Sequence, residues 1–217
     1  MSVAVKICGI TTPEALQVAM EAGADYVGFV FYPPSPRALD VEAAKALAAS
    51  ATRVKRVGVF VDPDDDLLAR VMAHVPLDLI QLHGSETPDR VAAVREQFNR
   101  RVIKAVPLAG RDDLEAAGAY QHVADFLLFD AKPPKSMADA LPGGNALRFD
   151  WEILRGVRVA RPWFLSGGLD AAVVGEAIRV AGAPGVDVSS GVEDRPGVKS
   201  PAKIRAFLKA AKMCDPQ

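Results

Sequence analysis

The amino-acid sequence predicts an α/β fold, a single (β/α)₈ barrel of parallel strands enclosed by helices. Short apolar segments alternate with alanine-rich segments eight times along 217 residues, and no linker interrupts the alternation. Apolar runs such as VGVFV and DFLLF are continuous, which is typical of strands buried on both faces of a parallel sheet. An open doubly wound sheet is the alternative, but eight units with glycine-rich turns after the last two favour the barrel. We expect one domain over residues 1–217.

Four strand–helix units are predicted in the first half of the chain. Thr12 is placed to cap the first helix, with Pro13 at its first position and Gly23 just beyond its end. The expected strands are Val3–Cys8, Asp25–Phe31, Lys55–Val61 and Leu77–Leu82, and the expected helices are Pro13–Ala22, Val41–Ser50, Asp64–His74 and Pro88–Phe98.

The second half repeats this order, with one long polar loop after the sixth strand. That loop carries Pro133, Pro134, Pro142, Gly143 and Gly144. The expected strands are Arg101–Val106, Asp125–Asp130, Pro162–Ser166 and Gly185–Ser189, and the expected helices are Arg111–Ala117, Asp150–Arg155, Asp170–Ala181 and Ser200–Lys212.

The composition argues against nucleic acid and membranes as partners. The chain has 26 basic and 27 acidic residues without a long block of either sign, so no surface for nucleic acid or an anionic membrane is expected. Cys8 and Cys214 are the only cysteines, which does not suit a disulfide scaffold. We find no secretory leader pattern and no apolar run of about 20 residues. A cytoplasmic protein, monomeric or homodimeric, is expected.

Two glycine-rich turns follow the seventh and eighth strands, where (β/α)₈ barrels often bind phosphate. Gly167 and Gly168 stand in LSGGLD, and Ser189, Ser190 and Gly191 stand in VDVSSGVE. Each turn on its own could be a simple chain reversal. Together they favour a phosphate ester held mainly by backbone N–H groups, since neither turn contains a lysine or arginine.

Polar residues also end the first and sixth strands, at the end of the barrel where active sites lie. Cys8 alone reads more readily as a small buried residue, and Asp130 alone could cap a turn or pair with Lys132. Both side chains are nevertheless expected at the same barrel mouth. A thiol and a carboxyl there could serve as a base and an acid, because their ordinary pKa values differ widely.

Three further side chains are candidates for substrate binding. Arg37 follows three prolines in FYPPSPR, and its planar guanidinium suits two-point capture of a carboxylate. Gln81 and His83 alternate in QLH and therefore face the same way, in a supporting role. No metal-ligand spacing, dinucleotide fingerprint or nucleophile elbow is present, so neither a metal nor a cofactor is expected.

These residues lie in motifs that resemble the phosphoribosylanthranilate isomerases of tryptophan biosynthesis. The resemblance covers essentially the whole chain, in order, through KICGIT, GFVFYPPSPR, VGVFV, QLHG, LLFDAK, PGG, FDW, LSGGL, VSSGVE and PGVK. One departure is visible in the loop after the sixth strand. Family members often carry GGxG there, whereas this chain has Gly143-Gly144-Asn145-Ala146.

The resemblance implies an isomerase of the ketose–aldose type, an intramolecular oxidoreductase. It would convert N-(5-phosphoribosyl)anthranilate to 1-(2-carboxyphenylamino)-1-deoxyribulose 5-phosphate by an Amadori rearrangement. It further implies Cys8 as general base, Asp130 as general acid and Arg37 as the ligand of the anthranilate carboxylate. The SGGL and SSG turns would hold the phosphate, and Asp187 would contact sugar hydroxyls.

Three alternatives remain. A histidine-pathway isomerase of similar chemistry would carry a carboxylate where Cys8 stands. A phosphosugar synthase would rely on lysines at several strand ends, but Lys6 and Lys104 are not terminal in their strands. A non-catalytic phosphate-binding module would have no use for Cys8 and Asp130.

Overall fold

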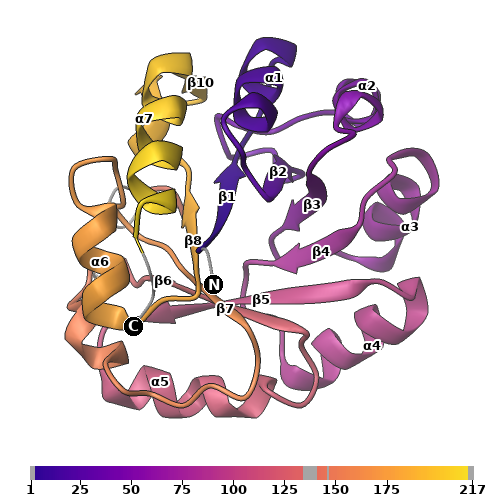
Figure 1. The fold of residues 1–217 in the computed structure, drawn as a ribbon. Coiled ribbons are helices and arrows are strands. Elements are labelled where there is room, and N and C mark those ends of the chain that lie inside the picture. Colours follow the sequence, from indigo (N-terminus) through magenta and orange to yellow (C-terminus); the bar gives the residue numbers. More distant parts are fainter. Residues whose placement is uncertain (1–2, 134–140, 146, 215–217) are drawn as a thin grey trace.

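The computed structural model, which describes residues 3–133, 141–145 and 147–214, is a closed barrel of eight parallel strands in sequence order. Strand β1 pairs with both β2 and β8, which closes the ring, and the helices surround it (Figure 1). The predicted TIM barrel is confirmed. The barrel strands are β1 (Ala4–Cys8), β2 (Tyr26–Val30), β3 (Lys55–Phe60), β4 (Leu79–Leu82), β5 (Arg101–Leu108), β6 (Phe126–Ala131), β7 (Trp163–Leu165) and β8 (Gly185–Val188).

Side-chain caps start most of the helices where the sequence predicted. Thr12, Asp64 and Thr87 each accept a hydrogen bond from a backbone N–H in the first turn of the following helix. In the described residues, no helix is both long and apolar enough to cross a membrane. The helices are α1 (Pro13–Glu21), α2 (Val41–Ser50), α3 (Asp65–His74), α4 (Pro88–Phe98), α5 (Arg111–Ala117), α6 (Val174–Ala181) and α7 (Pro201–Lys212).

Two predicted helices were wrong in extent. The helix expected over Asp150–Arg155 is a single 3-10 turn, η2 (Trp151–Leu154), which Gly156 follows at φ +71°. The helix expected from Asp170 begins at Val174. The Asp170 carboxylate accepts the N–H groups of Ala172 and Val173, which forms a separate turn ahead of the helix.

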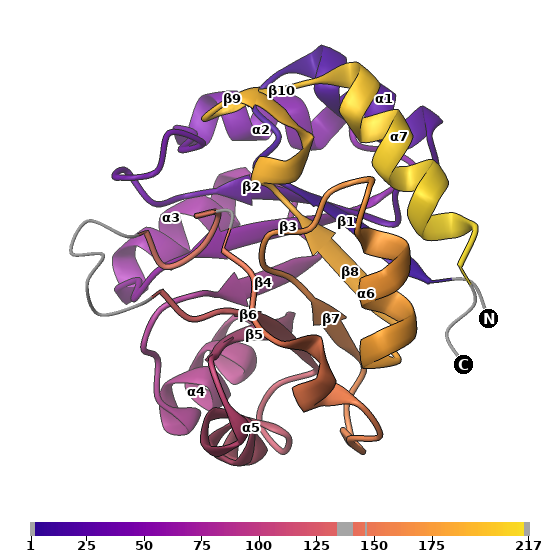
Figure 2. The same cartoon turned by 90° about the vertical axis from the view of Figure 1, so that its left-hand side faces the viewer.

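Two short elements between β8 and α7 were not predicted. A 3-10 turn, η3 (Ser190–Val192), leads into the hairpin of β9 (Glu193–Arg195) and β10 (Val198–Lys199) at the start of α7 (Figure 2). A further 3-10 turn, η1 (Gly118–Tyr120), extends α5. The turn dipeptide Pro196-Gly197 inside EDRPGVK is a signal that could have revealed the hairpin.

Aromatic side chains fill the half of the barrel interior that lies nearer the amino ends of the strands. Tyr26, Phe126 and Phe164 meet there edge to face or tilted, and the Tyr26 and Phe164 ring centroids are 5.3 Å apart. A second apolar layer packs between the strands and the surrounding helices. Because the interior is packed below, open space remains at the end where the strands finish.

A repeated contact fixes the opposite end of the barrel, where the strands begin. An aspartate directly precedes each of β2, β4 and β6: Asp25, Asp78 and Asp125. The carboxylate of each accepts the backbone N–H of a residue at the start of the preceding strand: Val5 (2.7 Å), Arg56 (2.8 Å) and Val102 (2.9 Å). The backbone N–H of each aspartate donates in return to the carbonyl of the same residue, at 2.9 Å. We call these contacts the aspartate clamps; they pair β1 with β2, β3 with β4, and β5 with β6.

Candidate active site

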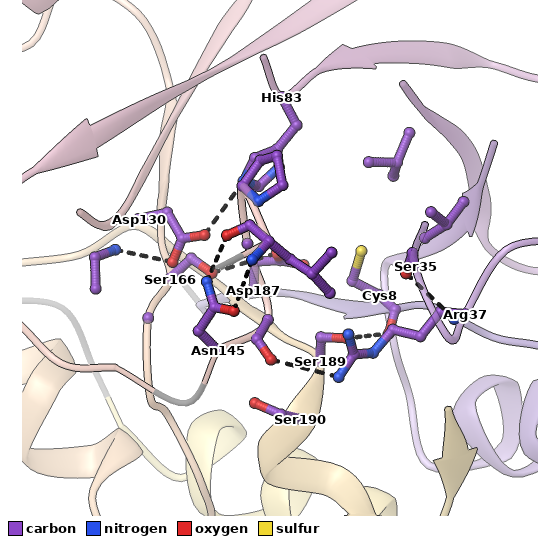
Figure 3. A pocket seen from close by; sticks show the side chains of 18 of the residues that line it. Cys8, Ser35, Arg37, His83, Asp130, Asn145, Ser166, Asp187, Ser189 and Ser190 are labelled. Atoms are coloured by element: carbon purple, nitrogen blue, oxygen red, sulfur yellow. Dashed lines mark hydrogen bonds and ion pairs between the residues drawn. The ribbon is translucent and has the colours of Figure 1, made fainter. Parts of the chain in front are cut away.

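A cavity opens at the carboxyl ends of the strands. Figure 3 shows Asp130 and His83 on one side of it and Cys8 and Arg37 on the other, with Asp187 between them. The residues predicted for one barrel mouth therefore lie together. Among the predicted site residues, those that line the cavity are Cys8, Arg37, His83, Asp130, Gly167, Gly168, Asp187, Ser189 and Ser190.

Cys8 ends β1 above a buried ion pair. Lys6, two residues earlier on the same side of the strand, is fully buried, and its Nζ lies 2.9 Å from Asp187 Oδ1. A side chain at Gly28 would touch both Cys8 Sγ and Lys6 Nζ, so these two groups share one small space. Burial raises the pKa of the Cys8 thiol, and the Lys6 ammonium opposes this without overcoming it.

Asp130 is held from two sides at the end of β6. Its Oδ1 accepts the backbone N–H of Ala131 at 2.9 Å, and its Oδ2 lies 3.2 Å from His83 Nε2. Gln81 Nε2 lies 2.7 Å from His83 Nδ1. Gln81 is fully buried and lies behind His83 rather than in the cavity lining, so its predicted direct contact with substrate is not supported. It contacts the cavity only through His83.

Arg37 is already paired within the chain. Its Nε donates to Glu193 Oε1 and its Nη2 to Glu193 Oε2, both at 2.8 Å, and both side chains are buried. The predicted two-point capture of an external carboxylate therefore cannot use the Nε–Nη2 edge. The Nη1 end remains for the cavity, beside Gly144.

Sequence reasoning missed the two partners that complete this arrangement, Glu193 and Lys199. Lys199 Nζ lies 2.7 Å from Glu193 Oε1 and 2.9 Å from the Ser189 carbonyl oxygen. Burial alone would raise the pKa of Glu193, but hydrogen bonds from Arg37 and the charge of Lys199 leave it below its usual range. Burial lowers the pKa of Lys199. The signal that could have found them is the Pro196-Gly197 turn, because a hairpin around it brings Glu193 and Lys199 opposite each other.

The two glycine-rich turns lie against each other. Gly191 packs so closely on the Leu169 carbonyl that no side chain could stand at this position, although it lies outside the cavity lining. Gly168 has φ +58°, and its carbonyl accepts Arg148 Nε at 2.8 Å. Within the described residues, no acceptor in the chain takes the Gly168 N–H. Arg148 and Lys199 therefore bring positive charge to turns that contain none themselves.

The loop after β6 is closed by its asparagine. Asn145 Oδ1 accepts the backbone N–H of Leu141 at 3.2 Å, and its Nδ2 donates to the Leu141 carbonyl. Asn145 thus takes a structural role in the segment that departs from the GGxG pattern, while Pro134 and Ala146 lie outside the described residues. Across the described residues, no group of three or more His, Cys, Asp or Glu side chains is placed to hold a metal ion.

Comparisons with known proteins agree with this arrangement. The family model described as N-(5'phosphoribosyl)anthranilate (PRA) isomerase matches residues 5–210. The N-(5'-phosphoribosyl)anthranilate isomerase of Rhodospirillum centenum is 58% identical over 97% of this chain and 99% of its own length. The crystal structure of phosphoribosyl anthranilate isomerase from Thermotoga maritima is 39% identical, with a TM-score of 0.87, covering 97% of this chain and 99% of that one.

A further crystal structure of phosphoribosyl anthranilate isomerase holds reduced 1-(o-carboxyphenylamino)-1-deoxyribulose 5-phosphate. It is 38% identical and has a TM-score of 0.84, covering 97% of this chain and 99% of that one. The ordered motifs, the closed barrel and these matches agree over nearly the whole chain. The chain belongs to the phosphoribosylanthranilate isomerase family and is an isomerase.

Proposed function

We propose that the chain converts N-(5-phosphoribosyl)anthranilate to 1-(2-carboxyphenylamino)-1-deoxyribulose 5-phosphate with Asp130 as general acid and Cys8 as general base. The observation that carries the proposal is their placement on opposite sides of one cavity (Figure 3), beside two adjoining glycine-rich turns. An acid and a base that flank a bound sugar can act on different atoms of it without moving.

The first step is the opening of the ribose ring. Asp130 donates a proton to the ring oxygen while the anthranilate nitrogen forms a C=N bond to carbon 1. His83 and Gln81 provide a means of holding that proton. If Gln81 Oε1 accepts from His83 Nδ1–H, His83 Nε2 is free to accept from protonated Asp130 Oδ2. Among the described residues, the buried Gln81 Oε1 has no hydrogen-bond donor, and rotating the amide group by half a turn would bring it to His83 Nδ1–H.

The second step is proton removal at carbon 2. The protonated C=N group makes this proton acidic, and the Cys8 thiolate takes it to give an enolamine. Return of a proton to carbon 1 and loss of the hydroxyl proton at carbon 2 then give the ketone. Carbon 2 is oxidised and carbon 1 is reduced within one molecule, so the reaction is an intramolecular oxidoreduction of the ketose–aldose type and consumes no external oxidant.

The ends of the substrate have separate binding groups. The two glycine-rich turns, with Gly167, Gly168 and Gly191, suit the phosphate, and Ser189 and Ser190 lie beside them. Arg37 Nη1 faces the anthranilate carboxylate from the opposite side. Asp187 Oδ1 accepts a hydrogen bond from Lys6 Nζ, and Asp187 Oδ2 lies 3.5 Å from Ser166 Oγ. Asp187 Oδ2 is the atom proposed to contact the sugar hydroxyls.

All of these groups belong to one chain, and β8 closes on β1, so residues 1–217 are proposed to act as one domain. The proposed partner is a small phosphorylated molecule in the cytoplasm, with no role for nucleic acid or a membrane.

The deciding experiment is a turnover assay with phosphoribosylanthranilate that follows loss of the anthranilate-type fluorescence. Rapid loss that depends on the protein supports the proposal. A folded protein that binds the compound but leaves its fluorescence unchanged would favour a phosphate-binding module instead.

The pH dependence follows from the environment of Cys8. Because burial raises the thiol pKa above its ordinary value of about 8.5, few thiolates exist at neutral pH, and more form as the pH increases. We expect kcat/KM to rise from pH 7 and to continue rising above pH ~8.5. Labelling of Cys8 by iodoacetamide, in a Cys214→Ala background, should rise over the same range. A kcat/KM that is flat between pH 7 and 10 would contradict thiolate catalysis.

A negative charge beside the glycine-rich turns should weaken phosphate binding. Ser190 is the better position for this test, because a side chain at Gly168 would strike Arg148 and the Leu147 carbonyl. We expect Ser190→Asp to raise KM at least about tenfold, through repulsion between like charges in the cavity, with kcat within about threefold. Ser190→Asn is the matched control of equal size. Equal KM values for the two variants would place the phosphate elsewhere.

A further inference from the structure

We propose that Glu193 is a positioning residue for Arg37, which together with Lys199 fixes the guanidinium so that its Nη1 end receives the aryl carboxylate. The inference rests on the proposed function, because Arg37 must bind the substrate for its orientation to matter. Neither Glu193 nor Lys199 is proposed as an acid or a base, yet both are buried, and Glu193 contacts Arg37, which lines the cavity.

The geometry of the pair determines which part of Arg37 remains available. Glu193 takes one hydrogen each from Nε and Nη2, at 2.8 Å, along one edge of the planar guanidinium. That edge is the only one that includes Nε, so the guanidinium can neither rotate nor withdraw without breaking both bonds. Its other end, with Nη1, lies next to Gly144, where an added Cβ would come within 2.7 Å of Nη1. A substrate carboxylate can meet Arg37 only at that end.

Lys199 fixes Glu193 in turn. The Lys199 ammonium donates to Glu193 Oε1 (2.7 Å), to the Ser189 carbonyl (2.9 Å) and to Ser189 Oγ (3.2 Å), which uses its three hydrogens. Glu193 Oε2 also accepts the Gly197 N–H at 3.3 Å. Both carboxylate oxygens thus have two donors each, and Glu193 has no alternative position within this set of contacts.

The charges of these three side chains do not cancel. Two cations, Arg37 and Lys199, share one carboxylate, Glu193, so the buried cluster has a net charge of +1. A buried charge is stabilised when an opposite charge reaches it. The carboxylate of the substrate supplies that charge, which makes the cluster selective for an anionic aryl group over a neutral one.

The hairpin of β9 and β10 brings the cluster together. Glu193 and Lys199 are paired residues on the two strands, and the turn between them contains Gly197. Gly197 lies directly against the Pro36 carbonyl, and Thr11 Oγ1 donates to the Gly197 carbonyl at 3.3 Å. The hairpin therefore packs against the loop that carries Arg37, and this contact brings Glu193 within hydrogen-bonding distance of the guanidinium.

The test compares two ligands in calorimetric titrations: the reduced product analogue with its carboxylate, and the same compound with a phenylamino group that lacks it. We expect Glu193→Gln to weaken binding of the carboxylated analogue by about ten- to a hundredfold, the range for a lost hydrogen bond to a charged group. Binding of the neutral analogue should change by less than about threefold. In turnover, KM should rise much more than kcat falls.

Asp78→Asn is the matched control, because Arg56 binds Asp78 through the same Nε and Nη2 atoms at the opposite end of the barrel. It should affect neither titration. Circular dichroism establishes that each variant is folded. If Glu193→Gln does not fold, Glu193→Asp provides the same comparison, with an intermediate loss expected because the shorter carboxylate reaches Arg37 less well.

A double-mutant cycle with Arg37→Met separates positioning from a structural role. If Glu193 acts through Arg37, Glu193→Gln should cause no further loss for the carboxylated analogue once Arg37 is methionine. The proposal is overturned if the loss persists in that background, or if both analogues lose affinity equally. If Arg37→Met itself binds the carboxylated analogue as wild type does, the assignment of Arg37 fails, which is a different result.

Discussion

Asp130→Asn should lower kcat by about two to four orders of magnitude, the usual contribution of a general acid. Asparagine has nearly the same shape and can keep the contacts to Ala131 and His83, but it cannot donate a full proton to the ring oxygen. The interaction lost is one made in the transition state, so binding of the reduced product analogue should stay within about threefold. Single-turnover kinetics and calorimetry measure the two quantities.

Asp125→Asn provides the matched control. Asp125 leads into the same strand from the opposite end, where its carboxylate contacts Arg95 and Val102. Its replacement should reduce the free energy of unfolding without changing kcat. A folded Asp130→Asn protein with kcat near that of the wild type would require another residue to protonate the ring oxygen.

Cys8→Ala should also lower kcat by about two to four orders of magnitude, because it removes the base that takes the proton from carbon 2. Cys8→Ser should be similarly impaired, since a serine hydroxyl does not ionise in this pH range. Both variants should lose the rise of kcat/KM above neutral pH. Ligand binding should persist, because the phosphate and carboxylate groups of the substrate meet other residues.

Cys214→Ala is the control for this second prediction. Cys214 follows α7, away from the cavity, and its Sγ lies 3.4 Å from the Ala210 carbonyl. Its replacement should leave the rate and the pH profile unchanged. If Cys8→Ala/Asp130→Ala folds and retains near wild-type kcat, the acid–base assignment must be abandoned.

Local signals were sufficient for most of the fold. Continuous apolar runs marked the eight strands, and capping residues such as Thr12 and Thr87 marked helix starts. The predictions failed where a side chain binds backbone groups that a helix would use, or where contacts between distant segments determine the local structure. The Asp170 carboxylate takes two N–H groups and delays α6, and the hairpin of β9 and β10 is too short for a periodic pattern.

The candidate site was predictable where a strand end determines it and not where distant segments meet. Cys8 is the last residue of β1 and Asp130 the last but one of β6, so the barrel alone brings them to one mouth. Arg37 and Glu193 are 156 positions apart, and nothing in local sequence states that one holds the other. The side chains of Gln81 and His83 point to the same side of β4, so the sequence predicted a place in the cavity for both. It could not show that Gln81 lies behind His83.

The Asp78 clamp keeps the acid resistance of the barrel separate from the pH dependence of catalysis. Burial alone would raise the pKa of Asp78, but bonds from the Arg56 side chain and backbone leave it below its ordinary 3.8. Its contribution to stability is complete above that ordinary value and is lost only as the pH falls through the lower, folded-state pKa. Cys8 ionises on the alkaline side of neutrality. This clamp lies at the amino ends of β3 and β4 and should therefore stay intact at every pH at which the thiolate forms. Substitutions around Cys8 could thus change the pH at which the enzyme works without weakening this end of the barrel.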